Sequence, residues 1–432
     1  MLIFTHTITP RLDYIFRYIL SEITDIPYSI TSDEQEYKQF TGAKINYSGA
    51  PFNSSEIWIK PADLLFETNI KEQAISCSHT GKFKAFYFTG GDFDFDVFAA
   101  SFYLLTRYEE YLPHHKDSYG RFAHENSLAF KEGFLQQPLV NNWITELRSM
   151  IANRFPQLPL RQKRFIFFPT YDIDMAWSYK NKGLLRNTGG FVKDLLKGRL
   201  YRLGERLAVL TGIKKDPFES YDWLHAFHQK NKLQPVYFFL VARKNNQYDK
   251  NISGDHSSMH ALIKNHAEQY LVGIHPSWQT DNADILKLEK AKLEEIIGQK
   301  VSYSRQHYIR FHLPGTYRQL IDAGILHDFS MGYGSINGFR ASVTTPFLWY
   351  DLERERQTDL LLHPFCFMDA NAYHEQKLLP FQALVELRAF TNQVKQAGGT
   401  MITIWHNNFL GTDPFFAGWR EIYQQWVTEI KE

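Results

Sequence analysis

Cysteine is scarce in this sequence: Cys77 and Cys366 are the only two among 432 residues. They lie far apart and outside any C-x-x-C spacing, which excludes a disulfide scaffold and a thiolate zinc site of the usual kind. An excess of charge of one sign is also missing, because 48 Lys and Arg stand against 47 Asp and Glu. This balance argues against a whole surface built for nucleic acid or an acidic ligand.

Long hydrophobic runs are absent as well. No stretch of about eighteen apolar residues occurs, so the sequence predicts no membrane span. The first residues, "MLIFTHTITPRLDYIF", lack a basic segment followed by a long apolar core, and they predict no signal peptide. Together with the rarity of cysteine, this pattern favours a reduced, cytoplasmic protein.

Aromatic residues, by contrast, make up 16% of the chain. They fill cores, but flat rings also pack on the apolar face of a sugar, so the excess is a weak indication of carbohydrate binding. The length indicates two domains. Strand, turn and helix patterns predict a smaller α/β domain of unknown role over residues 1–160, with a proline-punctuated boundary near residues 156–163.

From residue 164 onward, short apolar runs alternate with helical patterns. The clearest runs are "RFIFFPTYD", "PVYFFLVA", "YLVGIHPS", "LLLHPFCF" and "TMITIWHNN". Nearly continuous apolar strands between helices are typical of a parallel sheet covered on both faces. The sequence therefore predicts an α/β fold whose sheet is open or closed into a barrel, with the active site at the C-terminal ends of the strands.

Polar side chains collect at these predicted strand ends. The first run ends in Thr170, Asp172 and Asp174, so a buried strand delivers two carboxylates one residue apart. Other strand ends carry His275, Ser277, Arg305, His307, His406, Asn407 and Asn408. A parallel sheet would bring these distant segments together, and Asp and His ligands with a spare carboxylate make up a catalytic zinc-type site.

Four segments resemble, in order, the motifs of the polysaccharide deacetylase family of metal-dependent carbohydrate esterases. The similar segments are "TYDID" after the first strand, "GIHPS" at a strand ending in histidine, "SRQHY", and "TIWHN" on the last strand. The resemblance covers roughly residues 164–410 and is that of a bacterial branch with an extra N-terminal domain. It implies a (β/α) barrel of about seven parallel strands over residues 164–432.

The resemblance also implies a role for each matching residue. Asp172 is similar to the general base, and Arg305 is similar to the arginine that tethers it. Asp174 and His275 resemble metal ligands, and His406 resembles the general acid for the leaving amine. The implied reaction is hydrolytic removal of an acetyl group from an amino sugar or envelope glycan, assisted by a divalent metal that we expect to be zinc.

One position departs from the family pattern, because Gln279 stands where a second metal histidine is expected four residues after His275. The candidates to replace that ligand are His307 first, and then Ser277, His256 and His260. If none does so, the alternative is a catalytically inactive barrel that binds a carbohydrate or a partner. A glycoside hydrolase ranks third, because two acids on one strand do not readily flank a sugar bond.

Two further sets of residues carry predictions. The expected substrate contacts are Tyr171, Trp278, Tyr333 and Asn407. Residues 180–215 contain ten Lys or Arg against two acids, and residues 191–212 form a basic, amphipathic pattern. This pattern fits a solvated helix or an interfacial helix on anionic lipid. The predicted partners are therefore a glycan and a peripheral anionic membrane, with no nucleic acid.

Overall fold

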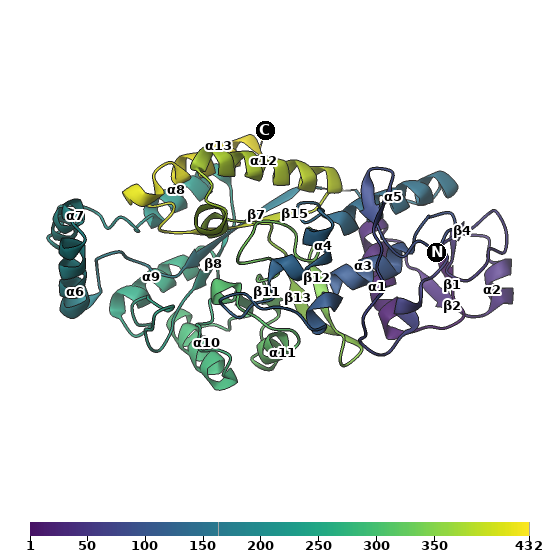
Figure 1. The fold of residues 1–432 in the computed structure, drawn as a ribbon, viewed down its shortest axis with the longest axis horizontal. Helices are drawn as coiled ribbons and strands as arrows, with labels where there is room; N and C mark the ends of the chain where they lie inside the picture. Colours follow the sequence, from purple (N-terminus) through teal and green to yellow (C-terminus); the bar gives the residue numbers. More distant parts are fainter. Residues whose placement is uncertain (163, 432) are drawn as a thin grey trace.

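The structure, a computed structural model, describes residues 1–162 and 164–431. Its strands form a four-stranded sheet, a nine-stranded sheet, and a hairpin of β5 (Ser78–Thr80) and β6 (Phe83–Ala85). Figure 1 shows an elongated molecule with the smaller sheet at its right-hand end and the larger sheet nearer the centre. The α/β class predicted from the sequence is confirmed.

The N-terminal sheet is parallel throughout, in the order β2–β1–β3–β4. Its strands are β1 (Leu2–Phe4), β2 (Ser29–Thr31), β3 (Lys44–Asn46) and β4 (Ile57–Trp58). The helices of this part are α1 (Pro10–Ile23), α2 (Glu34–Gln39), α3 (Val97–Leu105), α4 (Leu128–Lys131) and α5 (Leu139–Arg154). Helix α1 packs on α3 and α5, which buries its apolar face.

The larger sheet has the order β12–β13–β11–β10–β9–β8–β7–β15–β14. Among its strands in the described part of the chain, only β12 (Phe347–Asp351) runs antiparallel, to β13 (Arg356–Leu362). The other strands are β7 (Ile166–Ile173), β8 (Val236–Phe239), β9 (Leu271–Ile274), β10 (Tyr303–Ser304), β11 (His327–Asp328), β14 (Phe367–Met368) and β15 (Thr400–His406). The parallel sheet predicted for residues 164–432 is thus confirmed.

Closure of this sheet into a barrel of about seven strands is not confirmed. Within the described residues, β14 pairs with β15 alone, and no strand pair joins it to β11, β13 or the opposite edge strand β12. Single loop bonds connect these parts instead, as when the amide of Phe365 donates to the carbonyl of Met331 over 3.2 Å.

Helices cover the larger sheet. They are α8 (Tyr221–Asn231), α9 (Ser257–Ala267), α10 (Ala283–Ile297), α11 (Gly315–Asp322), α12 (Pro380–Ala397) and α13 (Trp419–Glu429). Helix α10 begins after Asn282, whose side chain accepts from the amide of Asp284, and ends at Gly298 with φ of 73°. Helix α12 ends at Gly398, the first residue of a Gly-Gly pair.

The N-terminal part is joined to the larger sheet by buried polar contacts. Arg11 on α1 pairs with Glu355 in the β12–β13 turn, with Nη2 2.5 Å from Oε1. The hydroxyl of Tyr14 donates to the carbonyl of Leu348 on β12 over 2.8 Å. Apolar side chains from both parts also form one continuous core. The N-terminal segment can therefore contribute side chains to a site on the larger sheet.

Helices α6 (Gly183–Leu196) and α7 (Leu200–Leu210) form a hairpin between β7 and α8. Figure 1 shows this α6–α7 hairpin standing away from the body at the left-hand end. It includes most of the basic segment noted in the sequence. Among the helices of residues 1–162 and 164–431, none combines the length and apolar character needed to cross a bilayer.

Candidate metal centre

Strand β7 explains how a buried strand delivers carboxylates to a site. Side chains alternate between the two faces of a strand, so Tyr171 and Ile173 enter the core while Asp172 faces the opposite way. Strand β15 pairs with β7 in register, which sets His406 directly beside Asp172. Asp174 follows the end of β7, and both carboxylates line one cavity at the C-terminal ends of the strands.

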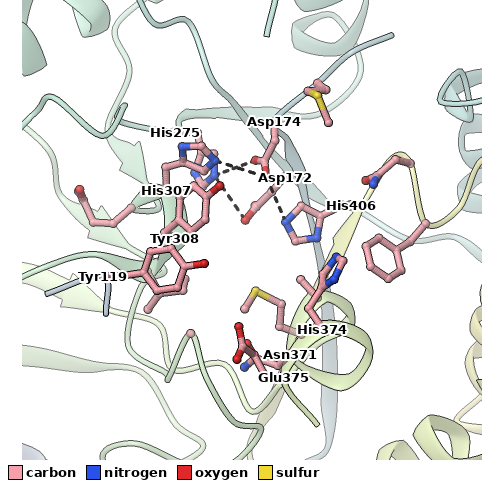
Figure 2. Close-up of a pocket in the computed structure, with 18 of the residues that line it drawn as sticks. Tyr119, Asp172, Asp174, His275, His307, Tyr308, Asn371, His374, Glu375 and His406 are labelled. Atoms are coloured by element: carbon pink, nitrogen blue, oxygen red, sulfur yellow. Dashed lines mark ion pairs between the residues drawn. The ribbon is translucent and has the colours of Figure 1, made fainter. Parts of the chain in front are cut away.

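The cavity has a volume of about 580 Å³ and collects polar side chains from several strand ends (Figure 2). Its wall includes Asp172 and Asp174 after β7, His275 after β9, His307 after β10, and His406 at the end of β15. The predicted convergence of these distant segments is therefore what the structure shows. A polar cavity at this edge is where parallel α/β sheets bind their ligands.

Asp174 is the centre of this cluster. One carboxylate oxygen, Oδ1, lies 3.1 Å from Nε2 of His275. The other, Oδ2, lies 3.5 Å from Nε2 of His307 and 3.5 Å from Nε2 of His406. The ligand atoms of Asp174, His275 and His307 all lie within 4.8 Å of one another. Figure 2 shows the rings turned toward the carboxylate.

The hydrogen-bond partner of Nδ1 in each of the three histidines determines which ring nitrogen carries the proton. Nδ1 of His275 lies 2.6 Å from the carbonyl oxygen of Arg305, which only accepts, so Nδ1 carries the proton. Nδ1 of His307 and Nδ1 of His406 face carboxylates in the same way. In the neutral rings, Nε2 therefore presents a lone pair toward the carboxylate of Asp174.

The Nε2 lone pairs and the carboxylate of Asp174 repel one another unless a positive charge lies between them. A metal ion would supply that charge, so we asked whether these residues suit one. Oδ1 of Asp174 is buried and has no hydrogen-bond partner within the described residues. One carboxylate and at least two imidazoles with Nε2 free form a zinc-type ligand set. The residues therefore fit a divalent cation held by Asp174, His275 and His307.

Without a cation, protons occupy the same space. Burial lowers the pKa of the His307 and His406 rings. Asp174 and Asp249 outweigh burial at His307 and raise its pKa to about 9. Asp369 and Asp174 likewise raise the pKa of His406 to about 10. Burial of Asp174 is outweighed by these two rings, which hold its pKa well below the ordinary value. The site is therefore built around concentrated negative charge at Asp174.

Asp172 is held by a buried guanidinium, as the sequence predicts. Nη1 of Arg305 donates to Oδ1 of Asp172 over 2.8 Å, and Nε donates to the carbonyl of Phe329 over 3.0 Å. The guanidinium lies over the ring of Phe238, 4.5 Å from its centroid. Oδ2 of Asp172 lies 3.8 Å from Nε2 of His275. Arg305 thus fixes one oxygen and leaves the other beside the metal ligands.

Two buried carboxylates that sequence reasoning missed orient the histidines. Oδ1 of Asp369 lies 2.6 Å from Nδ1 of His406, and Oδ2 accepts from the amide of the same residue. Oδ1 of Asp249 lies 3.0 Å from Nδ1 of His307 and also accepts from the amide of Trp278. Asp369 directly follows β14, so the strand-end rule could have found it. Asp249 lies in the long loop after β8, where that rule gives no signal.

The N-terminal part also reaches the cavity, which the sequence did not predict. Tyr119 and Arg121 belong to the loop before α4, and both line the wall. The ring of Tyr119 stacks on Tyr308, with 5.2 Å between centroids, and Nη1 of Arg121 donates to the carbonyl of Tyr308 over 2.7 Å. Tyr308 and Ile309 have φ of 59° and 54°, a strained conformation for such residues directly after His307.

None of the four predicted substrate contacts is among the described residues that line the cavity, and the first two serve packing. The hydroxyl of Tyr171 lies 2.7 Å from Nε2 of His228 in the core on the other face of β7. Trp278 stacks on Tyr248 with 3.7 Å between ring centroids. Strand alternation accounts for Tyr171, which faces the opposite side of β7 from its cavity-lining neighbour Asp172.

The other two predicted contacts, Tyr333 and Asn407, also form hydrogen bonds within the protein and do not line the cavity. The hydroxyl of Tyr333 accepts from Nη2 of Arg107 over 3.1 Å. Nδ2 of Asn407 donates to the carbonyls of Met175 and Phe218 over 3.0 and 2.9 Å. The neighbour of Asn407, Asn408, lines the cavity instead.

The four candidates to replace a metal histidine at position 279 differ in whether they line the cavity. His307 reaches Asp174, whereas Ser277, His256 and His260 do not line the cavity. The ring of His256 caps α9 by accepting from the amide of Ser258. Gln279 is exposed and lies outside the cavity wall. Of these candidates, His307 is therefore the one that faces Asp174, and it comes from the next strand end, after β10.

Comparison with known proteins gives one sequence match. Residues 1–156 match DUF7033, a family of unknown function. No curated protein matches at a significant level. The sequence match covers the N-terminal part and leaves the strands that carry the cavity outside it.

The solved structures that resemble the chain include polysaccharide deacetylases. A protein from Mycobacterium smegmatis described as one has 14% identity and a TM-score of 0.40, covering 62% of this chain and 85% of its own. Another from Pseudomonas aeruginosa has 12% identity and a TM-score of 0.36, with the same coverage. A pseudoenzyme of carbohydrate esterase family 4 from Bacillus anthracis has 10% identity and a TM-score of 0.31, covering 63% and 61%.

Proposed function

We propose that the protein is a metal-dependent hydrolase that removes an acetyl group from an N-acetylated amino sugar or envelope glycan. The observation that carries this proposal is the convergence of Asp174, His275 and His307 within 4.8 Å. Beside them lie a carboxylate tethered by arginine and a histidine backed by carboxylate. Amide hydrolysis of this type uses a metal site flanked by a general base and a general acid.

The residues around the cation divide the reaction between them. A divalent cation, when bound, polarises an amide carbonyl and makes a water molecule more acidic. Asp172, held at Oδ1 by Arg305, accepts the proton of that water on Oδ2 as the oxygen bonds to the acyl carbon. His406 donates its Nε2 proton to the nitrogen as the carbon–nitrogen bond breaks. The products are acetate and a free amine.

The proton donor is prepared by its surroundings. Asp369 fixes Nδ1 of His406 at 2.6 Å and favours the charged ring. The donor and the base then have opposite protonation states in one cavity, which hydrolysis requires. The stacked rings of Tyr119 and Tyr308 offer an aromatic wall of the kind that packs on a sugar face.

The alternative of an inactive carbohydrate-binding protein rested on Gln279. That argument weakens because Gln279 is outside the cavity and His307 supplies an imidazole. A glycoside hydrolase keeps the lowest rank. Asp172 is tied to an arginine and Asp174 faces three imidazoles, so neither is placed to act as a neutral acid.

The test begins with the metal content of protein purified without added metal. We expect about one equivalent of zinc or a similar ion, lost in Asp174→Ala and His275→Ala. His79→Ala, at an exposed strand position, is the matched control and should keep the metal. Acetate release from N-acetylated amino sugars should then follow metal content. A wild-type protein that takes up no metal even on reconstitution would refute the proposal.

A further inference from the structure

The α6–α7 hairpin turns its apolar side chains outward. On α6, Leu184, Leu185 and Leu196 are 83%, 90% and 81% exposed. On α7, Leu200 and Leu207 are 67% and 54% exposed. Positions 184, 185, 192, 195 and 196 all carry exposed apolar residues and fall on one face of a helix with 3.6 residues per turn. The hairpin therefore presents a contiguous apolar surface rather than scattered single leucines.

The interior of the hairpin is polar. Nη2 of Arg206 on α7 donates to Oδ2 of Asp194 on α6 over 2.7 Å, and Nη1 donates to Asn187 over 3.1 Å. All three side chains are buried, and the guanidinium covers the ring of Tyr179. A surface helix in water normally buries its apolar stripe and exposes its polar one. This hairpin does the reverse, so its outer face is built for an apolar medium.

Cations flank the apolar stripe. Arg186, Lys193 and Lys197 follow one another at seven and four residues, which places them along one edge of α6. All three are exposed, and neither lysine has a carboxylate within 4.0 Å among the described residues. The acids of the hairpin are already paired, Asp194 with Arg206 and Glu205 with Lys214. The outer face is therefore apolar and positively charged.

We propose that the α6–α7 hairpin docks the protein on an anionic membrane surface. The leucines enter the boundary between headgroups and acyl chains, and the lysines of α6 extend to lipid phosphates. The charge argues against a second copy as the occupant, because a contact between two such faces would bring both sets of unpaired lysines into one interface. An anionic lipid surface is complementary to both features, because its acyl chains accept the apolar stripe and its headgroups attract the cationic edge.

The hairpin is fastened to the cavity rim. Nη2 of Arg186 donates to the carbonyl of Lys250 over 2.6 Å, and Lys250 lines the cavity. At the base of the hairpin, Asp216 accepts from the amides of Ser178 and Tyr179, both over 2.8 Å. Docking would thus hold the cavity near a membrane, which suits a lipid-linked or nascent envelope glycan. This last consequence rests on the proposed function, and the docking itself does not.

The test uses the full-length protein and vesicle flotation. We expect binding to vesicles of phosphatidylcholine with phosphatidylglycerol, little binding to phosphatidylcholine alone, and weakening as salt is raised. L184S/L185S/L196S and K193E/K197E should each reduce binding about tenfold or more. Leu288→Ser and Val385→Ser, exposed positions on α10 and α12, should leave it unchanged.

Three results would overturn docking: no binding to anionic vesicles at low salt, equal binding to neutral vesicles, or binding that survives both hairpin variants. Light scattering tests whether a second copy of the chain occupies the surface instead. A wild-type dimer that L184S/L185S/L196S abolishes, in a protein that does not bind vesicles, would assign the surface to a second copy. Circular dichroism checks that the variants fold. Their metal content should equal that of the wild type, so docking and the proposed hydrolase fail or succeed separately.

Discussion

Nε2 of His307 lies 3.5 Å from Oδ2 of Asp174, on the same carboxylate that lies 3.1 Å from His275. The third side chain of this cluster thus comes from the strand end after β10, not from the segment that follows His275. The exchange of a histidine at position 279 for His307 is possible because β9 and β10 are neighbours in the parallel sheet, so both strand ends open on the same edge.

The first prediction concerns that exchange. His307→Ala should lose the bound metal, because Asp174 and His275 alone leave two protein ligands. Adding Gln279→His to His307→Ala should not restore the metal, since position 279 is exposed and lies outside the cavity wall. Metal analysis after reconstitution measures both. Recovery of a full equivalent in the double variant would show that position 279 reaches the site and that the assigned ligand set is wrong.

The second prediction concerns Asp249, which orients His307. Asp249→Asn should keep the fold of the loop yet weaken metal affinity about 10–100-fold, the usual cost of losing a carboxylate behind a metal histidine. Competition with a chromophoric chelator gives the affinity. Asp255→Asn is the control, because that exposed carboxylate of the same loop pairs with Lys292 and Ser253 and does not line the cavity. Equal affinities in both variants would leave Asp249 with a purely structural role.

The third prediction concerns the proton donor. Asp369 raises the pKa of His406, so Asp369→Asn should lower that pKa and deplete the charged ring as pH rises. The turnover number for acetate release should fall about 100-fold, and its alkaline limb should move to lower pH. Nitrogen NMR of the histidine rings gives a second readout of the shift. Asp359→Asn, at an exposed position of β13, is the control, and an unmoved alkaline limb in Asp369→Asn would contradict the role.

The sequence was enough to find the main elements of the site because they lie at strand ends. The strand-end rule placed Asp172, Asp174, His275, His307 and His406 at one edge of the sheet. This rule depends on a buried parallel sheet, which the apolar runs indicate. It identifies which side chains meet, but not which atoms face each other.

Contacts set by loops and by distant segments could not be predicted. Asp249 reaches His307 from a long loop, and Tyr119 reaches Tyr308 from the N-terminal part. No periodicity encodes such contacts, because each depends on how non-neighbouring parts dock. The position of Tyr171, a predicted substrate contact, has a separate cause. Its aromatic type suited a sugar, whereas its place on β7 turns it into the core.

The last prediction concerns the ion-pair cluster at the junction of the N-terminal part with the larger sheet. Glu110 is buried between two arginines: its Oε1 accepts from Nε of Arg107 over 2.7 Å and from Nε of Arg340 over 2.8 Å, and its Oε2 accepts from Nη2 of Arg340 over 2.6 Å. Burial would raise the pKa of Glu110, but Arg340 and Arg107 outweigh it and hold the value at about 2.

The sign of the pH effect follows from that depressed pKa. The charged carboxylate contributes its stability fully above the unfolded value of about 4.5, and the contribution is lost as pH falls toward about 2. Glu110→Gln leaves two buried guanidinium groups without their anion, so it should lower the free energy of unfolding at pH 7 by about 3 kcal/mol. Its stability should then fall less than that of the wild type between pH 4.5 and pH 3. Urea unfolding at pH 7, 4.5 and 3 measures both effects, and Glu34→Gln, at an exposed pair on α2, should match the wild type. A Glu110→Gln variant as stable as the wild type at pH 7 would mean that the cluster does not hold the two parts together.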